Sequence, residues 1–204
     1  YLAGSILRDY KKGERLLYDY KLPDGLEDYQ RFEEPLITPT TKADKGEHDE
    51  AISYKNIISE KICTKEQLDK IYSIAIALFK LGTEVYNKID WILVDTKYEF
   101  GIDENGNISV MDEIHTPDSS RFWKKSTYVS QSKKNVNPEI FDKDIIRNHL
   151  LEQGFSGDGR VPYVAQAKYI QLLQAYYYIY KVLTKETIAI SKKNNFNLNE
   201  LNII

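Results

Sequence analysis

The feature that most constrains the fold is a dipeptide, Asn105 followed by Gly106, that separates two segments with the pattern of β-strands. Residues 91–101 begin with a short apolar run typical of a buried strand and continue with alternating polar and apolar side chains. Asn-Gly is favoured in two-residue hairpin turns because both positions there need a positive φ angle, and residues 108–114 then form the returning strand. The sequence therefore predicts a β-hairpin over about residues 91–114.

Segments with helical periodicity lie on both sides of this hairpin. Thr64 and Gln67 form a capping box, and apolar side chains follow at three- and four-residue spacing to about Lys88. Further helices are expected at residues 3–12, 142–153 and 164–183. Strands and helices do not alternate regularly. The predicted class is therefore α+β, with a mixed or antiparallel sheet that contains the central hairpin and is flanked by helices.

The other segments are expected to be a strand and two loops. Residues 16–22 alternate apolar and polar side chains, which predicts a half-buried strand. Residues 33–50 combine two prolines with a dense run of charges, and such a long polar loop often carries function when it is ordered. Residues 115–123 contain Pro117 and are expected to form a second loop. We expect residues 1–204 to form one compact unit.

Composition excludes several classes of protein. The net charge is −3 with 29% charged residues of both signs, whereas a non-specific nucleic-acid binder is usually strongly basic. Cys63 is the single cysteine, so no disulfide can form within the chain, and a reducing, cytoplasmic setting is expected. No apolar stretch has the length of a membrane span, so neither a nucleic acid nor a membrane is expected as a partner.

The predicted hairpin carries a group of charged side chains. Residues two apart on a strand share a face, which places Asp95, Lys97 and Glu99 together. With a two-residue turn, Glu99 lies directly opposite Asp112, where two carboxylates repel each other unless a cation lies between them. Few hard oxygen ligands, completed by phosphate, are what Mg²⁺ prefers at a nucleotide. The alternative is a solvent-exposed hairpin with a face of mixed charge.

The segment after the hairpin offers both donors and acceptors to a substrate. Asp118, Ser119, Ser120 and Arg121 follow Pro117 in the expected loop, and a guanidinium group can hold a phosphate through two parallel hydrogen bonds. The alternative is a serine or aspartate turn with Arg121 on the protein surface. The pattern does not decide between the two.

Together these segments resemble the signature segments of the SAICAR synthetase family, and they occur in that family's order. Residues 95–101 and 112–123 are similar to two signatures, and residues 35–50 to a third. Residues 1–5 resemble its Ala-Gly-Ser element. The run Asp142, Lys143 and Asp144, with Arg147 after it, also fits. The resemblance covers residues 1 to about 180.

The resemblance implies an enzyme of purine biosynthesis that uses ATP and Mg²⁺. It would join the amino group of L-aspartate to the carboxylate of carboxyaminoimidazole ribotide, 5-amino-1-(5-phosphoribosyl)imidazole-4-carboxylate, and release ADP and phosphate. Two alternatives stay open, a related ATP-dependent small-molecule kinase and an inactive binding module. The oligomeric state is also open.

The resemblance also implies roles for particular residues. Lys97 and Asp95 are the implied catalytic residues. Glu99 and Asp112 are the implied Mg²⁺ ligands, and with Lys97 they bind the nucleotide. The implied substrate-binding residues are Ser5, Lys42, Asp44, His48, Asp49, Asp118, Ser120, Arg121, Lys143 and Arg147.

Within the substrate-binding set, Ser5 and Arg121 would hold the phosphate of the ribotide, and Asp118 would contact the ribotide itself. The residues of the polar loop would close over the site. Lys143 and Arg147 lie four apart on a predicted helix and share a face. They would bind a carboxylate, or they form a solvated basic edge of the helix.

The family pattern also contains a glycine-rich N-terminal region that covers ATP, and an arginine before the Ala-Gly-Ser element. Neither occurs in these 204 residues. The chain is therefore interpreted as the central and C-terminal part of a SAICAR synthetase, and without that region we expect weak ATP binding.

Overall fold

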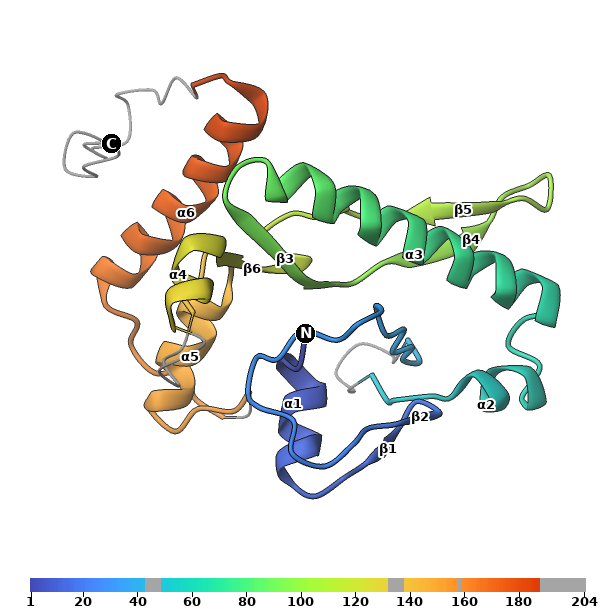
Figure 1. Ribbon diagram of the computed structural model, residues 1–204. Coiled ribbons are helices and arrows are strands. Elements are labelled where there is room, and N and C mark those ends of the chain that lie inside the picture. The colour runs from blue at the N-terminus through green and yellow to red at the C-terminus, as the bar shows by residue number, and fades with distance from the viewer. Residues whose placement is uncertain (43–48, 132–137, 158, 188–204) are drawn as a thin grey trace. The chain divides into compact units, whose positions relative to one another are not determined.

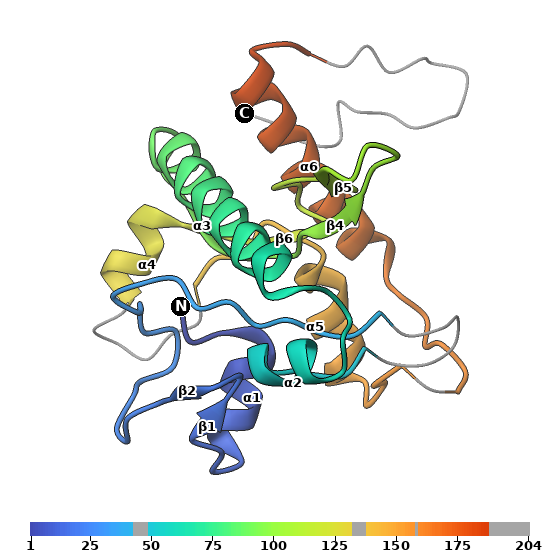
Figure 2. The ribbon, with the colours of Figure 1, turned by 90° about the vertical axis from the view of Figure 1, so that its right-hand side faces the viewer.

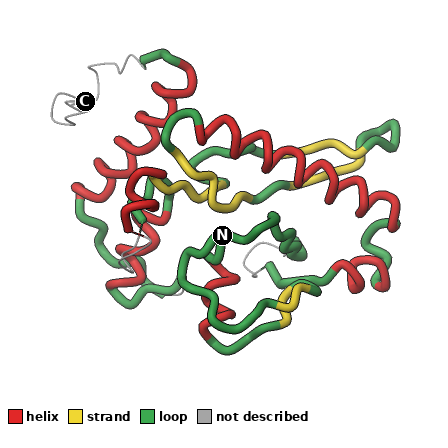
Figure 3. Tube along the Cα trace, viewed as in Figure 1, coloured by secondary structure: helices red, strands yellow, loops and turns green. Residues whose placement is uncertain are grey.

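The computed structural model of the chain describes residues 1–42, 49–131, 138–157 and 159–187. Its helices and short antiparallel strands confirm the α+β class (Figure 1, Figure 3). Contacts divide the chain into two units, residues 1–84 with 97–113 and residues 85–96 with 114–204. The expectation of one compact unit concerns how these two are placed relative to each other, and it stays a prediction.

The first unit begins with helix α1 (Gly4–Lys11), as predicted. The expected strand over residues 16–22 is wrong. It is two short strands, β1 (Leu16–Leu17) and β2 (Tyr20–Lys21), which pair antiparallel. The chain reverses between them because Tyr18 and Asp19 both adopt positive φ angles, 52° and 70°. An apolar cluster joins these elements, and its buried members are Leu2, Ile6, Tyr10 and Leu22.

Two helices follow in the same unit, α2 (Tyr54–Ser59), which was not predicted, and α3 (Lys65–Asn87). The capping box is confirmed. The backbone N–H of Gln67 donates to Thr64 Oγ1 at 3.2 Å, and that of Thr64 to Gln67 Oε1 at 2.9 Å. Figure 2 shows α3 as one continuous helix, and its last residues, from Val85, belong to the second unit.

The predicted hairpin is present, but it is shorter than expected and its register differs by one residue. Strands β4 (Glu99–Ile102) and β5 (Ile108–Met111) pair Glu99 with Met111 rather than with Asp112. The turn is longer than two residues because the Asp103 carboxylate accepts the N–H groups of Asn105 and Asn107, at 2.9 and 2.7 Å. Such aspartate turns compete with the two-residue form, and here only Gly106 needs a positive φ, 81°.

The apolar run at residues 91–94 forms a strand, as predicted, but not as part of the hairpin. Strand β3 (Trp91–Thr96) pairs with β6 (Ser120–Lys124), so the expected loop at residues 115–123 is wrong over its last four positions. The pairing is driven by burial, because Leu93 and its partner Phe122 are both fully buried. A bulge between Leu93 and Asp95 ends the regular register.

Helices cover this pair of strands within the second unit. They are α4 (Lys125–Gln131), α5 (Asp144–Glu152) and α6 (Gln166–Thr184), and the last two were predicted within two residues at each end. The core is aromatic. Trp91 lies 4.3 Å from Phe141 and 5.7 Å from Tyr178 of α6, measured between ring centroids. In the part of the chain that the structure describes, no helix is both long and apolar enough to cross a membrane.

Candidate functional site

The polar loop of the first unit is held closed at its base. Thr40 and Ala51 form an isolated antiparallel bridge, and the Thr41 N–H donates to the Glu50 carbonyl at 2.8 Å. The two arms therefore run side by side and end at Lys42 and Asp49. The predicted site residues Asp44 and His48 lie outside the described residues.

The loop arms and the start of β4 bring four predicted site residues together, which we call the hairpin cluster: Lys42, Asp49, Lys97 and Glu99. Glu99 accepts from Lys42 Nζ at 2.7 Å and lies 3.0 Å from Lys97 Nζ. Lys97 Nζ is also 3.8 Å from the Asp49 carboxylate. Lys97 and Glu99 therefore lie together, as predicted, although Lys97 stands between β3 and β4 rather than on a strand.

The cations and anions of the hairpin cluster shift each other's pKa values. The hydrogen bond from Lys42, followed by that from Lys97, lowers the pKa of Glu99 below its ordinary value. The pKa of Lys97 is raised, first by its hydrogen bond to Glu99 and then by the charges of Glu99, Asp49 and Asp112. Both groups are thus held ionised at neutral pH.

The carboxylates near Lys97 fit a cation that keeps most of its coordination shell for phosphate and water. Glu99 and Asp112 both lie near the ammonium group of Lys97, which shows that this region already attracts a positive charge. Among the described residues, no three His, Cys, Asp or Glu side chains are placed to hold a metal ion by themselves. One or two carboxylates together with phosphates is the arrangement that Mg²⁺ uses at nucleotide sites.

The second unit holds a different group, which we call the arginine cluster: Asp95, Arg121, Asp142, Asp144 and Arg147. Arg121 Nε donates to Asp144 at 2.7 Å, and Arg121 Nη1 donates to Asp95. Arg147 of α5 binds the other oxygen of Asp144. Burial lowers the pKa of Arg121, but the carboxylates of Asp95 and Asp144 outweigh it and raise that pKa overall. Asp95 therefore belongs with Arg121, not on one strand face with Lys97 and Glu99.

Asp142 is the most buried charged group in the described residues, with 1% of its surface exposed. Burial, and then repulsion by Asp144, raises the pKa of Asp142 to about 7. Neither Asp142 nor Asp144 was among the predicted site residues. An acidic pair at a predicted helix start was visible in the sequence, but its burial against β6 depends on a strand pairing that the sequence did not reveal.

A chain of hydroxyl groups leads into β6 in the same unit. Thr116 Oγ1 lies 3.3 Å from Ser119 Oγ, which is 3.2 Å from Ser120 Oγ, and Ser120 Oγ is 2.8 Å from Thr96 Oγ1. Ser120 is buried, so this network holds its hydroxyl in place. The Asp118 N–H donates to Thr116 Oγ1 at 3.3 Å, so the turn here is made by a threonine. The alternative of a serine or aspartate turn with Arg121 on the surface is wrong for Arg121, whose side chain is only 16% exposed.

The remaining predicted residues are placed separately. Lys143 precedes α5, and its Nζ lies 3.7 Å from Asp118. Lys143 and Arg147 thus bind different carboxylates, Asp118 and Asp144. Ser5 is exposed in the first turn of α1.

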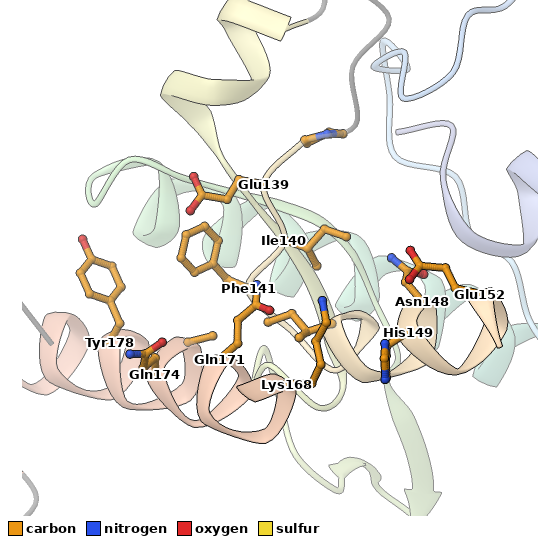
Figure 4. A pocket seen from close by; sticks show the side chains of 13 residues that line it. Glu139, Ile140, Phe141, Asn148, His149, Glu152, Lys168, Gln171, Gln174 and Tyr178 are labelled. Carbon is orange, nitrogen blue, oxygen red and sulfur yellow. The ribbon is translucent and has the colours of Figure 1, made fainter. Parts of the chain in front are cut away.

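A cavity of about 670 Å³ lies apart from the predicted residues of the second unit, between α5, α6 and residues 138–141. Figure 4 shows polar side chains around it, among them Glu139, His149 and Lys168. Of the described residues that line the cavity, none belongs to the predicted site or to the arginine cluster.

Comparison with known sequences gives consistent results. A family model described as SAICAR synthetase matches residues 1–162. A putative phosphoribosylaminoimidazole-succinocarboxamide synthase 2 of Agrobacterium fabrum is 46% identical over 188 residues, which cover 90% of this chain and 60% of that protein. The phosphoribosylaminoimidazole-succinocarboxamide synthase of Bacteroides thetaiotaomicron is 41% identical over 202 residues, 98% of this chain and 63% of the relative. The chain thus spans less than two thirds of the length of these relatives.

Solved structures of SAICAR synthetases are also similar to this chain. The yeast (Saccharomyces cerevisiae) SAICAR-synthase complexed with SAICAR superposes with a TM-score of 0.74 at 29% identity, over 93% of this chain and 59% of that one. A SAICAR synthetase in complex with ADP superposes with a TM-score of 0.59 at 30% identity, over 92% of this chain and 61% of that one. These folds agree with the expectation of a SAICAR synthase-like α+β structure.

Proposed function

The chain belongs to the SAICAR synthetase family, and on that basis we propose that it takes part in the family's ligase reaction. L-Aspartate would be joined through its amino group to the carboxylate of carboxyaminoimidazole ribotide, with ATP converted to ADP and phosphate. The observation that carries the proposal is the family match over residues 1–162, because every predicted site residue lies within it.

The hairpin cluster supports a role in binding ATP. Lys97 and Lys42 supply two ammonium groups at one carboxylate, and an incoming triphosphate can take over their positive charge. Glu99 and Asp112 would hold Mg²⁺, which when bound neutralises charge on the phosphate oxygens. Lys97 remains positively charged throughout because its pKa is raised by the surrounding carboxylates.

The arginine cluster supports a role in holding the ribotide. Arg121 uses Nε and Nη1 for its own carboxylate partners, and no described residue bonds its Nη2 group. A guanidinium held at two positions can present its third nitrogen to a phosphate in a fixed direction. Ser5, Asp118, Ser120, Lys143 and Arg147 are proposed as further substrate contacts.

The reaction needs little from the protein beyond position and charge. ATP would activate the ribotide carboxylate, the aspartate amine would attack it, and an amide would form as phosphate leaves. Positioning two reactants and stabilising the developing charge are the large contributions to such transfers. The proposed catalytic residues are Lys97, whose ammonium group would face the activated carboxylate, and Asp95.

Measurement of ADP release tests the proposal. The protein that contains this chain is supplied with Mg-ATP, carboxyaminoimidazole ribotide and L-aspartate, and each is omitted in turn. We expect release only when all three are present. Release without aspartate would favour a small-molecule kinase, and no release under any condition would favour a binding module.

A further inference from the structure

The side chain of Asp142 accepts two hydrogen bonds, one from the residue that follows Arg121 and one from Asp144, the partner of Arg121. Asp142 Oδ2 accepts the N–H of Phe122, the residue after Arg121 in β6, at 2.9 Å. Asp142 Oδ1 accepts the N–H of Asp144 at 2.8 Å, and Asp144 in turn accepts Arg121 Nε at 2.7 Å. The buried Asp142 carboxylate therefore links the backbone next to Arg121 in β6 to the backbone of Asp144 at the start of α5.

The bond to Phe122 extends a ladder of backbone bonds along the edge of β6. Trp123 and Ile140 form an antiparallel bridge, and the Phe141 N–H donates to the Phe122 carbonyl at 3.3 Å. At residue 142 the chain turns into α5 and no longer follows β6. The Asp142 side chain supplies the next acceptor in place of a backbone carbonyl, and so fixes the start of α5 against the strand that carries Arg121.

Burial gives this arrangement its rigidity. A buried carboxylate is strongly unfavourable unless its oxygens accept hydrogen bonds, so Asp142 is held to both N–H groups. Arg121 and Asp144 are nearly buried as well, with 16% and 11% of their side chains exposed. A shift of either backbone segment would break the bond from Arg121 Nε.

We propose that Asp142 is a positioning residue that sets the direction of the Arg121 guanidinium by joining β6 to the start of α5. It does not touch the substrate. The part of the proposal that concerns binding of the ribotide by Arg121 rests on the proposed function. The placement of the guanidinium itself is independent of the reaction.

Asp142→Ser separates this role from simple capping of α5. Serine is as good an acceptor as aspartate at a helix start, so it can keep the bond to the Asp144 N–H, but a single short hydroxyl cannot also hold Phe122. We expect the KM for the ribotide to rise about tenfold, the range expected for a lost bond to a charged group, with the KM for ATP unchanged. If the serine variant does not fold, the same measurements are made on Asp142→Asn, which keeps the size of the side chain.

Asp103→Ser is the matched control. Asp103 also accepts two backbone N–H groups, those of Asn105 and Asn107, but it lies in the hairpin turn of the other unit. We expect this variant to leave the KM for the ribotide unchanged. A rise in both KM values for Asp142→Ser, or an equal rise for Asp103→Ser, would overturn the proposal.

A second readout does not depend on the reaction. In ¹⁵N NMR spectra, the Nε–H of Arg121 should give a signal protected from exchange with water in the unaltered protein, because it is bonded to Asp144 in a nearly buried position. Loss of that protection in folded Asp142→Ser supports the positioning role, and unchanged protection would refute it. If the unaltered protein shows no ribotide-dependent ADP release while protection is lost, the proposed function fails and the positioning role stands.

Discussion

The hairpin cluster and the arginine cluster contain the same kinds of charge, but the central cations of the two clusters differ in exposure. In the first, the cations are lysines whose side chains are 77% and 58% exposed at Lys42 and Lys97. In the second, Arg121 is 16% exposed and its partner Asp144 is 11% exposed. Water therefore screens the two lysines strongly and the Arg121–Asp144 pair weakly. The contrast indicates that the lysines can exchange partners easily, whereas the Arg121–Asp144 pair is fixed.

This difference would suit the two proposed tasks, binding of ATP with its metal ion and binding of the ribotide phosphate. A triphosphate with its metal ion brings and removes several charges in each cycle, and exposed lysines can follow it without loss of stability. A phosphate anchor must stay in one direction, which favours a planar guanidinium held by two carboxylates. The predictions below test this division, beginning with the largest effect.

Arg121→Ala should have the largest effect on stability. The change leaves Asp95 and the nearly buried Asp144 without their shared cation, and removal of one partner of a buried ion pair costs about 3–5 kcal/mol. Urea unfolding followed by circular dichroism measures the change. Arg121→Lys should recover part of the stability but not the KM for the ribotide, because an ammonium group cannot make both bonds in the same geometry. A loss below about 1 kcal/mol would show that the arginine cluster is not fixed by its charges.

The two clusters should respond to pH in opposite directions. The pKa of Asp142 is raised from its ordinary value of 3.8 to about 7. The stability that this shift contributes is complete below about pH 4 and is lost as the pH rises from there through 7, at up to about 1.4 kcal/mol per pH unit. The pKa of Glu99 is lowered, so its contribution is present at neutral pH and is lost as the pH falls below its ordinary value of 4.5.

Urea unfolding at pH 5 and pH 8 separates these contributions. Asp142→Asn removes the titrating group, so the stability of the unaltered protein relative to this variant should decrease from pH 5 to pH 8. Glu99→Gln should show no such trend over the same interval, because Glu99 is ionised throughout it. A constant difference for Asp142→Asn would mean that Asp142 is ionised at both pH values.

The sequence predicted elements whose signals are local, and it missed those that depend on distant pairing. The capping box at Thr64, helices α5 and α6, and the apolar strand at residues 91–94 are set by neighbouring residues, and the structure confirms them. The partner of that strand is β6, which lies 24 or more residues away and does not alternate, because the adjacent Phe122 and Trp123 are both buried. Burial of Asp142 follows from that pairing, so no local pattern could reveal it.

The candidate site shows the same limit. Lys97 and Glu99 are two residues apart and were predicted to lie together, and the structure joins them in an ion pair. Asp95, which was predicted to lie with them, pairs with Arg121 instead. The register that placed Glu99 opposite Asp112 was wrong, because the Asp103 side chain stabilises a longer turn than Asn-Gly by itself would favour. A one-residue change in a turn shifts every cross-strand pair, which is why a register inferred from turn type is fragile.

Glu99→Gln should weaken the use of Mg²⁺ and leave the fold intact. Replacing a proposed ligand by a neutral amide should raise the Mg²⁺ concentration needed for half-maximal ADP release about tenfold or more. Glu104→Gln is a control with the same change of charge, since Glu104 is exposed in the hairpin turn. An unchanged Mg²⁺ requirement for Glu99→Gln would remove Glu99 from the metal site and leave it as a partner of the lysines.

Lys42→Ala should have the smallest effect on stability, although it removes a 2.7 Å ion pair. Lys42 is 77% exposed, and such pairs contribute about 0.5 kcal/mol or less once the order imposed on a long side chain is subtracted. Lys65→Ala, which removes the exposed 2.6 Å pair with Asp69 in α3, is the matched control, and the two changes in unfolding free energy should agree within error. Distance alone therefore does not rank these ion pairs, because the 2.7 Å bond from Arg121 to Asp144 is nearly buried. A loss of about 2 kcal/mol for Lys42→Ala would show that the hairpin cluster is a fixed structural element as well, and the division of tasks between the two clusters would fail.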